Sequence, residues 1–96
     1  MIPTKLRLLG KRWTVKLQSP KGGKDAGECD HITATISVSP KQTEDSRRDT
    51  LLHEVTHAVD EELQLRMTER QVRLMATGLL EAFRSNPALV AYLVGD

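Results

Sequence analysis

The stretch ITATISVSPKQTEDSRRDTLLHEVTHAVDEEL, residues 32–63, determines how the chain is expected to fold. Up to Pro40, apolar residues alternate with threonine and serine, and this period of two predicts a strand with one buried face. After Pro40, apolar residues recur with helical spacing, which predicts a helix over about 45–64. The change of period at Pro40 separates a β-rich part of the chain from a helical part.

Two shorter strands are predicted before this stretch. Apolar residues fall two apart over residues 5–8 and again over residues 13–17, with a tight turn at Gly10 and Lys11 between the two runs. Residues 19–30 are rich in glycine, proline and charged residues, so we expect a loop there. The N-terminal part therefore supplies three strands.

Two further helices are predicted after the long one. Thr68 is an N-cap candidate with Gln71 three residues later, which is the capping-box pattern, so the second helix should begin at Glu69. Asn86 followed by Pro87 is typical of an N-cap and the first residue of a helix, and it marks a short last helix. The inward faces of one strand and two helices predict one core, made of Ile32, Ile36, Val38, Leu52, Val55, Val59, Val72, Met75, Leu79, Leu80 and Phe83.

Length and composition indicate one globular domain. A chain of 96 residues can build one modest core, here divided into a β-rich part at 1–40 and a helical part at 41–96. The predicted fold class is α+β: a small, mostly antiparallel three-stranded sheet packed on one side against the long helix, with two further helices completing the core. No stretch has the roughly 18 apolar residues that cross a bilayer, and a single cysteine, Cys29, fits a reducing compartment. We therefore expect a cytoplasmic protein without a signal peptide or a membrane partner.

Charge is distributed unevenly along the chain. Residues 1–24 carry seven Lys or Arg and no acid, whereas residues 25–96 carry seven basic and thirteen acidic residues, so the net charges are +7 and −6. A basic arm of this kind can face nucleic acid. The basic residues alternate with apolar ones, however, as they do on the wet face of a β-ribbon. We therefore favour a solvated strand face and keep nucleic acid as an alternative partner.

The motif HExxH occupies residues 53–57, inside the predicted long helix. Histidines four residues apart lie on one helix face and about 6 Å apart along the axis, so His53 and His57 can bind one metal ion. Glu54 is turned about 100° away from them and can reach a water molecule on that ion. The alternatives are a pair of surface histidines and a purely structural metal site.

A catalytic zinc ion needs a third protein ligand and an open fourth position. Glu61 continues the stripe of His53 and His57, but it lies about 12 Å along the axis from His53, and one straight helix cannot surround an ion. The third ligand should therefore come from another element, and Glu69 is well placed at the start of a second helix that we expect to run antiparallel to the first. The full set of candidates is Asp60, Glu61, Glu62, Glu69, Glu81 and Cys29.

This arrangement resembles the gluzincin-type zinc peptidases, in particular the minimal ones related to the ImmA/IrrE group and to short phage or prophage proteins. The similarity covers residues 51–87 and lies in LLHEVTHAVD at 51–60, TERQV at 68–72, Met-Ala at 75–76 and Asn-Pro at 86–87. The resemblance implies hydrolysis of a peptide bond in a peptide or protein substrate, with one Zn²⁺ per chain bound by His53, His57 and Glu69 and with Glu54 as the general base. The strands upstream match in pattern only.

Other HExxH families fit this chain less well. Metzincins require glycine and histidine where this chain has Asp60 and Leu63. Peptide deformylases take a ligand from an upstream cysteine, but Cys29 lacks their Gly-Cys-Leu-Ser context. Cys29 stays open as an alternative third ligand.

Several further residues are candidates for the site. Larger gluzincins stabilise the oxyanion with a Tyr or His, for which His31 and Tyr92 are available, although we favour an ordinary surface position for both. Asp60 or Glu61 could orient a ligand imidazole, but solvent exposure is the simpler interpretation. An extended substrate could pair with the strand at 32–38 if that strand is an edge. Its polar residues would then be the substrate-binding ones: Thr33, Thr35 and Ser37.

Two other functions remain as alternatives to a peptidase. One is a non-catalytic, metal-stabilised binding or regulatory module, since 96 residues leave little material for a deep specificity cleft. The other is a DNA-associated peptidase similar to the Spartan-type repair proteases, with the basic arm at 5–24 on DNA. Metal-free stability would favour the first alternative, and salt-sensitive DNA binding the second.

Overall fold

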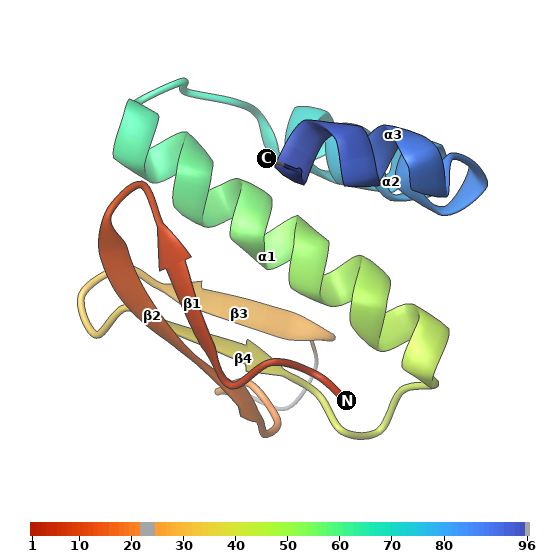
Figure 1. Cartoon of the computed structure of the whole chain (residues 1–96). Helices are drawn as coiled ribbons and strands as arrows, with labels where there is room; N and C mark the ends of the chain where they lie inside the picture. The colour runs from red at the N-terminus through yellow and green to blue at the C-terminus, as the bar shows by residue number, and fades with distance from the viewer. Residues whose placement is uncertain (22–24, 96) are drawn as a thin grey trace.

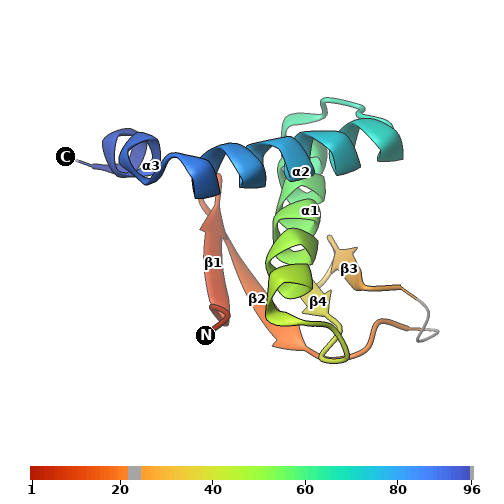
Figure 2. The same cartoon turned by 90° about the vertical axis from the view of Figure 1, so that its right-hand side faces the viewer.

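The computed structural model describes residues 1–21 and 25–95 and has the predicted α+β architecture. A sheet is followed by three helices, and all three helices lie on the same side of the sheet (Figures 1 and 2). The strands are β1 (Lys5–Leu8), β2 (Lys11–Leu17), β3 (Gly27–Asp30) and β4 (Thr35–Val38). The helices are α1 (Glu44–Leu63), α2 (Glu69–Ser85) and α3 (Pro87–Val94).

The sheet has four strands in the order β1-β2-β4-β3, so the prediction of three strands is wrong. β1 pairs with β2 and β3 with β4 in antiparallel fashion, whereas β2 and β4 are parallel, which makes the sheet mixed. The missed strand is β3, in the segment expected to be a loop. Its sequence, Gly-Glu-Cys-Asp, shows no alternation of apolar and polar residues, so the period of two was not visible there.

β4 is shorter than predicted and is not an edge strand. Residues 31–34 form a turn in which the Asp30 carboxylate accepts hydrogen bonds from the backbone N–H groups of Ile32 and Thr33, at 2.9 and 3.2 Å. The turn is completed by Ala34 in a left-handed conformation with φ of 53°. Ile32 is therefore 97% exposed, and its assignment to the core is wrong. The edge position falls to β3 instead.

The core forms between the sheet and α1. Strand residues on one face and Ala58 of α1 pack together, while the residues between them on the strands point away from the helices. The buried strand residues are Trp13, Val15, Ile36 and Val38. Leu51 and Val55 of α1 pack against this cluster, which confirms that the sheet buries one face against the HExxH helix.

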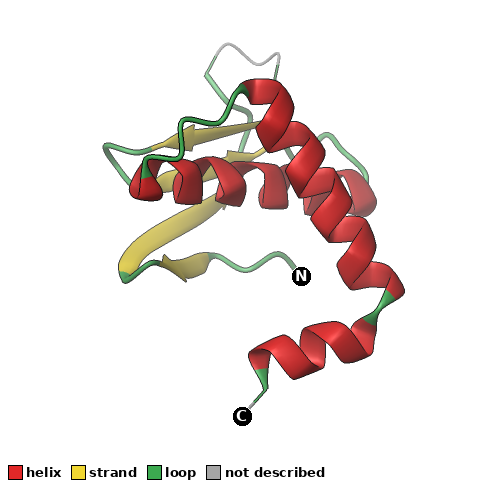
Figure 3. Cartoon of the chain, turned by 90° about the horizontal axis from the view of Figure 1, so that it is seen from above, coloured by secondary structure: helices red, strands yellow, loops and turns green. Residues whose placement is uncertain are grey.

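The helices begin where the capping residues predict. The Thr43 side chain accepts a hydrogen bond from the backbone of Ser46 at the start of α1, and Thr68 forms both halves of a capping box with Gln71 at the start of α2. α2 crosses α1 rather than running antiparallel alongside it (Figures 2 and 3). The prediction of an antiparallel pair is therefore wrong, although α2 does lie directly on α1.

α2 and α3 contribute less to the core than predicted. α2 buries Val72 and Ala76, but Met75 and Leu79 of the same helix are 51% and 38% exposed. α3 has no buried residue and contacts α2. α2 crosses α1 (Figure 3), and its last turn reaches the start of α1 through an ion pair between Arg84 and Asp45, at 3.3 Å. Leu52, Val55, Val59, Leu80 and Phe83 are partly buried.

No helix among the described residues combines the length and the apolar character that a membrane crossing requires.

Candidate metal centre

Two histidines of α1 and one glutamate of α2 converge on one point. The Nε2 atoms of His53 and His57 lie 2.8 and 2.9 Å from the two carboxylate oxygens of Glu69. The three side chains can each offer one ligand atom, with all three atoms within 4.8 Å of one another. Among the described residues, this is the group of His, Cys, Asp or Glu side chains that could hold a metal ion.

The connection between the helices is shaped to deliver Glu69. α1 ends at Gln64 in a left-handed conformation, with φ of 53°, and Arg66 repeats this conformation with φ of 58°. The Asp60 carboxylate then accepts a hydrogen bond from the backbone N–H of Met67 at 3.0 Å. Asp60 therefore fixes the loop that places the third side chain, a role different from the orientation of an imidazole considered above.

The donor set fits zinc. Two imidazole nitrogens and one carboxylate oxygen are a typical set for a catalytic zinc ion, which keeps its fourth position open. Ligand atoms about 2.0 to 2.1 Å from a tetrahedral ion lie about 3.3 Å from one another. The two histidines contact different oxygens of Glu69, at 2.8 and 2.9 Å, and one ligand atom from each of the three residues lies within 4.8 Å of the others, so a rearrangement of these side chains would accommodate the ion.

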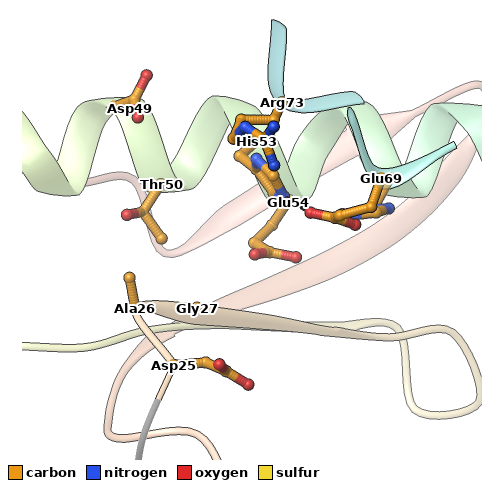
Figure 4. Close-up of a pocket in the computed structure, with 10 residues that line it drawn as sticks. Asp25, Ala26, Gly27, Asp49, Thr50, His53, Glu54, Glu69 and Arg73 are labelled. Carbon is orange, nitrogen blue, oxygen red and sulfur yellow. Dashed lines mark ion pairs between the residues drawn. The ribbon is translucent and has the colours of Figure 1, made fainter. Parts of the chain in front are cut away.

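Glu54 lies beside this group and is buried. Its side chain is 7% exposed, and it points from α1 toward β3, with Glu69 next to it (Figure 4). Glu54 and the three possible ligands line one cavity of about 550 Å³. The other lining residues come from the start of β3, from α1 and from α2: Asp25, Ala26, Gly27, Asp49, Thr50 and Arg73.

The surroundings of Glu54 favour its protonated form. Burial, followed by the negative charges of Glu69, Asp25 and Glu28, raises the pKa of the Glu54 carboxyl from 4.5 to about 7. A cation bound by the neighbouring histidines would act in the opposite direction, because it favours the carboxylate. Glu54 is thus placed to exchange a proton near neutral pH.

Gly27 allows β3 to approach α1 closely at Glu54. A Cβ atom at position 27 would lie 2.5 Å from the Thr50 methyl group and 3.0 Å from a carboxylate oxygen of Glu54. Contacts this short cannot be accommodated without a shift of the strand or the helix. Glycine is therefore needed here for space, and the signal in the sequence was only one glycine in a glycine-rich segment.

Gly27→Ala is expected to lower the free energy of unfolding by about 1 to 3 kcal/mol, the usual cost of overpacking. It should also displace the Glu54 carboxylate, which would lie 3.0 Å from the added Cβ atom. Thermal unfolding and zinc content measure the first effect and the integrity of the site. Gly78→Ala is the matched control: it has open space on α2 and should stabilise the protein by about 0.5 to 1 kcal/mol. Equal effects of the two substitutions would contradict this interpretation.

Two candidate oxyanion donors lie outside the cavity. His31 sits in the turn after β3, with its ring edge-on to Trp13 at a centroid distance of 5.8 Å. Its backbone carbonyl accepts a hydrogen bond from Lys11 at 3.4 Å. Tyr92 is 84% exposed on α3. Neither residue lines the cavity that contains Glu54.

The three polar residues expected to bind substrate are also elsewhere. Ile36 and Val38 of β4 face α1, so the side chains of Thr35 and Ser37 point to the opposite face of the sheet. There they line a separate depression together with Thr33. Because β4 is flanked by β2 and β3, it offers no free edge to a substrate, and the condition for this prediction is not met.

Cys29 is not brought to the histidines. Its side chain packs against the sheet–α1 core, and burial together with the charge of Glu54 raises the pKa of its thiol to about 12. The structure thus places Glu69, and not Cys29, beside His53 and His57.

Glu69→Ala is expected to weaken zinc binding by at least about 100-fold, because one of three ligands is lost. Cys29→Ser should leave zinc affinity unchanged, and so should Glu61→Ala, which removes an exposed acid of α1. Competition with a chromogenic chelator measures all three variants. Strong loss in Cys29→Ser with retention in Glu69→Ala would reverse the assignment.

Two charged residues that line the cavity were not identified from the sequence. Arg73 comes four residues after Glu69 and therefore lies on the same face of α2, a signal that helical periodicity contains. Asp25 lies in the segment before β3, and nothing in its sequence context separates it from other loop acids. Both residues line parts of the cavity that exist only once α2 and β3 are packed near α1.

The likeness of this chain to zinc peptidases is confined to the site. Comparisons with models of protein families, with curated proteins and with solved structures find no match. The part of the resemblance that the structure supports is the group of His53, His57 and Glu69 with its HxxxH spacing.

Proposed function

We propose that this protein is a zinc-dependent peptidase. The observation that carries the proposal is the buried Glu54 carboxylate in the same cavity as the three-residue group of His53, His57 and Glu69. A purely structural metal site needs no such neighbour, since structural zinc is closed by four ligands. A three-ligand site beside a buried acid is the arrangement that hydrolysis requires.

In this proposal, three residues bind the metal ion and one residue transfers protons. His53, His57 and Glu69 would hold the zinc ion. Zinc bound in this way is a Lewis acid, which polarises a carbonyl group and lowers the pKa of a water molecule. Glu54 would accept the proton of the attacking water and pass it to the leaving amine, because its buried carboxyl group lies in the same cavity as the three ligands.

The position of β3 supports an extended substrate. β3 pairs with β4 on one side only, so its other edge has backbone N–H and C=O groups free to pair. Gly27, the first residue of this strand, and Ala26 before it line the cavity. A peptide added to this edge would pass the metal group and would be held mainly by backbone hydrogen bonds, which tolerate many sequences.

Arg73 supplies a positive charge to the cavity. A guanidinium group can donate hydrogen bonds to an oxygen on which negative charge develops. Neither His31 nor Tyr92 lines the cavity, so Arg73 is the side chain that we assign to this role.

Arg73→Gln is expected to lower kcat by at least about 10-fold with zinc content unchanged, because a charged donor to the transition state is lost. Arg73→Lys should retain part of the activity. Steady-state hydrolysis of a quenched peptide measures both variants, with Arg70→Gln as a control on the same helix. A change in KM alone would assign Arg73 to substrate binding instead.

A non-catalytic, metal-stabilised binding module is the second candidate. The observation that favours it is α3, whose residues are Pro, Ala, Leu, Val and Tyr throughout and of which none is buried. A helix that is apolar all round is normally covered. In this candidate the metal would stabilise the fold, and the helices would contact another protein.

Hydrolysis by the zinc-loaded protein distinguishes the two candidates. The substrate should be permissive, such as an unfolded protein or a quenched peptide library. Cleavage by wild type that is lost in Glu54→Gln supports the peptidase. Bound zinc without cleavage of any substrate favours the binding module, and equal cleavage by both proteins contradicts the assigned mechanism.

A further inference from the structure

The face of the β1–β2 hairpin that points away from the helices is basic. Leu6, Trp13 and Val15 face α1, so the residues between them on the two strands point to the other side of the sheet. α1, α2 and α3 all lie on the other side of the sheet (Figures 1 and 2). The basic side chains on it, here called the basic face, are Lys5 and Arg7 of β1 and Arg12 and Lys16 of β2, all exposed.

The register of the hairpin places like charges directly opposite one another. Arg7 of β1 lies directly opposite Arg12 of β2. Two residues away on the same strands, Lys5 lies opposite Thr14. Like charges at directly opposite positions destabilise an antiparallel pair. None of the four residues of the basic face forms an ion pair with a residue that the structure describes.

A fifth basic residue of the hairpin differs from the four residues of the basic face in its contacts. Lys11 pairs with Leu8 and therefore lies on the helix side. Its ammonium group lies 5.4 Å from the centre of the Trp13 ring and donates a hydrogen bond to the His31 carbonyl at 3.4 Å. Lys11 thus takes part in the packing of the hairpin. The four residues of the basic face have no such structural role among the described residues.

The negative charges of the sheet lie at its opposite edge. On the outward face, Glu28 and Asp30 of β3 are opposite Ser37 and Thr35 of β4, so β4 lies between them and the hairpin. They line one depression with Lys16 but not with Arg7 or Arg12. Among the described residues, no acidic side chain forms an ion pair with Arg7 or Arg12, so none offsets the repulsion between these opposed residues. An external polyanion would relieve it.

We propose that the basic face binds the sugar-phosphate backbone of nucleic acid. Side chains two residues apart on one strand face are about 6.6 Å apart, so the outward positions of the hairpin form a ladder with this repeat. Lys5, Arg7, Arg12 and Lys16 occupy four of these positions, and Thr14 lies between Arg12 and Lys16. A flexible polyanion with a regularly repeated charge matches this ladder. The outward face of the hairpin carries no aromatic side chain, because Trp13 points into the core, so it offers no platform for stacking bases.

The contacts are therefore with phosphates, and binding is independent of sequence and strongly dependent on salt. The basic face and the metal centre lie on opposite sides of the sheet, and β3, which borders the cavity, is the edge opposite β1. Nucleic acid on the basic face leaves the cavity open. The proposal does not depend on the activity proposed for the metal centre.

The test is fluorescence anisotropy with labelled DNA of about 20 nucleotides, as a duplex and as a single strand, at several salt concentrations. With four phosphate contacts, log K should fall with log salt at a slope of about −3 to −4 for the duplex, a loss of about 100-fold between roughly 50 and 200 mM salt. The double variant Arg7→Gln/Arg12→Gln should bind at least about 10-fold more weakly at low salt, with a slope smaller by about 2. Its melting temperature should not fall, because a repulsive pair is removed.

The matched control is Arg66→Gln/Arg70→Gln, which removes the same charge from exposed residues at the start of α2 and the loop before it. This variant should bind DNA like wild type. Loss of binding to either DNA form in the hairpin variant alone supports the proposal. Equal loss in both variants, unchanged binding in the hairpin variant, or binding to vesicles containing anionic lipid with none to DNA would overturn it.

Discussion

Glu54→Gln is expected to retain one zinc ion per chain and to lose at least about 100-fold in peptide hydrolysis, the usual scale for a positioned acid or base. The substitution keeps the size and polarity of the side chain but removes its ability to accept a proton. His53, His57 and Glu69 are untouched, so zinc binding should persist. Thermal stability should be close to that of wild type or higher, because Glu54 is buried near other carboxylates.

Two measurements on the same preparation make this test sharp. Zinc content by elemental analysis shows whether the site is intact, and turnover of a quenched peptide library shows whether it is active. Glu62→Gln, an exposed acid of α1, is the matched control and should behave like wild type. Loss of zinc together with activity in Glu54→Gln would mean that Glu54 supports the metal site rather than the reaction.

Removal of zinc is expected to abolish hydrolysis and to destabilise the fold. A ligand that binds the folded state and is present at about a thousandfold above its Kd stabilises that state by about 4 kcal/mol, and a chelator removes this contribution. Thermal unfolding with and without chelator, followed by addition of zinc, measures the effect and its reversibility.

His53→Ala is the variant that controls for the chelator. It should contain no zinc after purification without added metal, and its melting temperature should match that of chelated wild type and not respond to zinc. Wild type that contains no zinc under these conditions, or whose stability is indifferent to zinc, would contradict the metal site itself. Either of these two outcomes would contradict the metal site. A Glu54→Gln variant that stays fully active would instead contradict only the proposed reaction.

The helices were predictable because their signals are local. The capping pattern of Thr68 and Gln71 and the Asn86–Pro87 pair specify helix starts within four residues of sequence, and the structure follows them. β3 was not predictable, because its strand character comes from pairing with β4 and from contact with α1, not from an alternating pattern. Ile32 was misassigned because the Asx turn at Asp30 interrupts a run that alternates without a fault.

The candidate site, too, was predictable only where its residues belong to one local element. The spacing of His53 and His57 and the position of Glu54 follow from one helix, so the sequence contains them. Glu69 could be expected because a short connection limits how far α2 can begin from α1. Asp25, Gly27 and Arg73 belong to walls built by separate elements, and only the crossing of α2 over α1 and the edge position of β3 bring them together.

The narrow contact between α2 and α1 has a consequence for the motions of the protein. The fully buried residues of α2 are Val72 and Ala76, and no residue of α3 is buried, so this C-terminal segment buries little apolar surface against the remainder of the fold. Segments of this kind open as cooperative units at a lower free energy than global unfolding. An ion shared by α1 and Glu69 would act as a cross-link between the two units, so metal occupancy would set the rate at which the C-terminal segment detaches and exchanges its amide hydrogens with solvent.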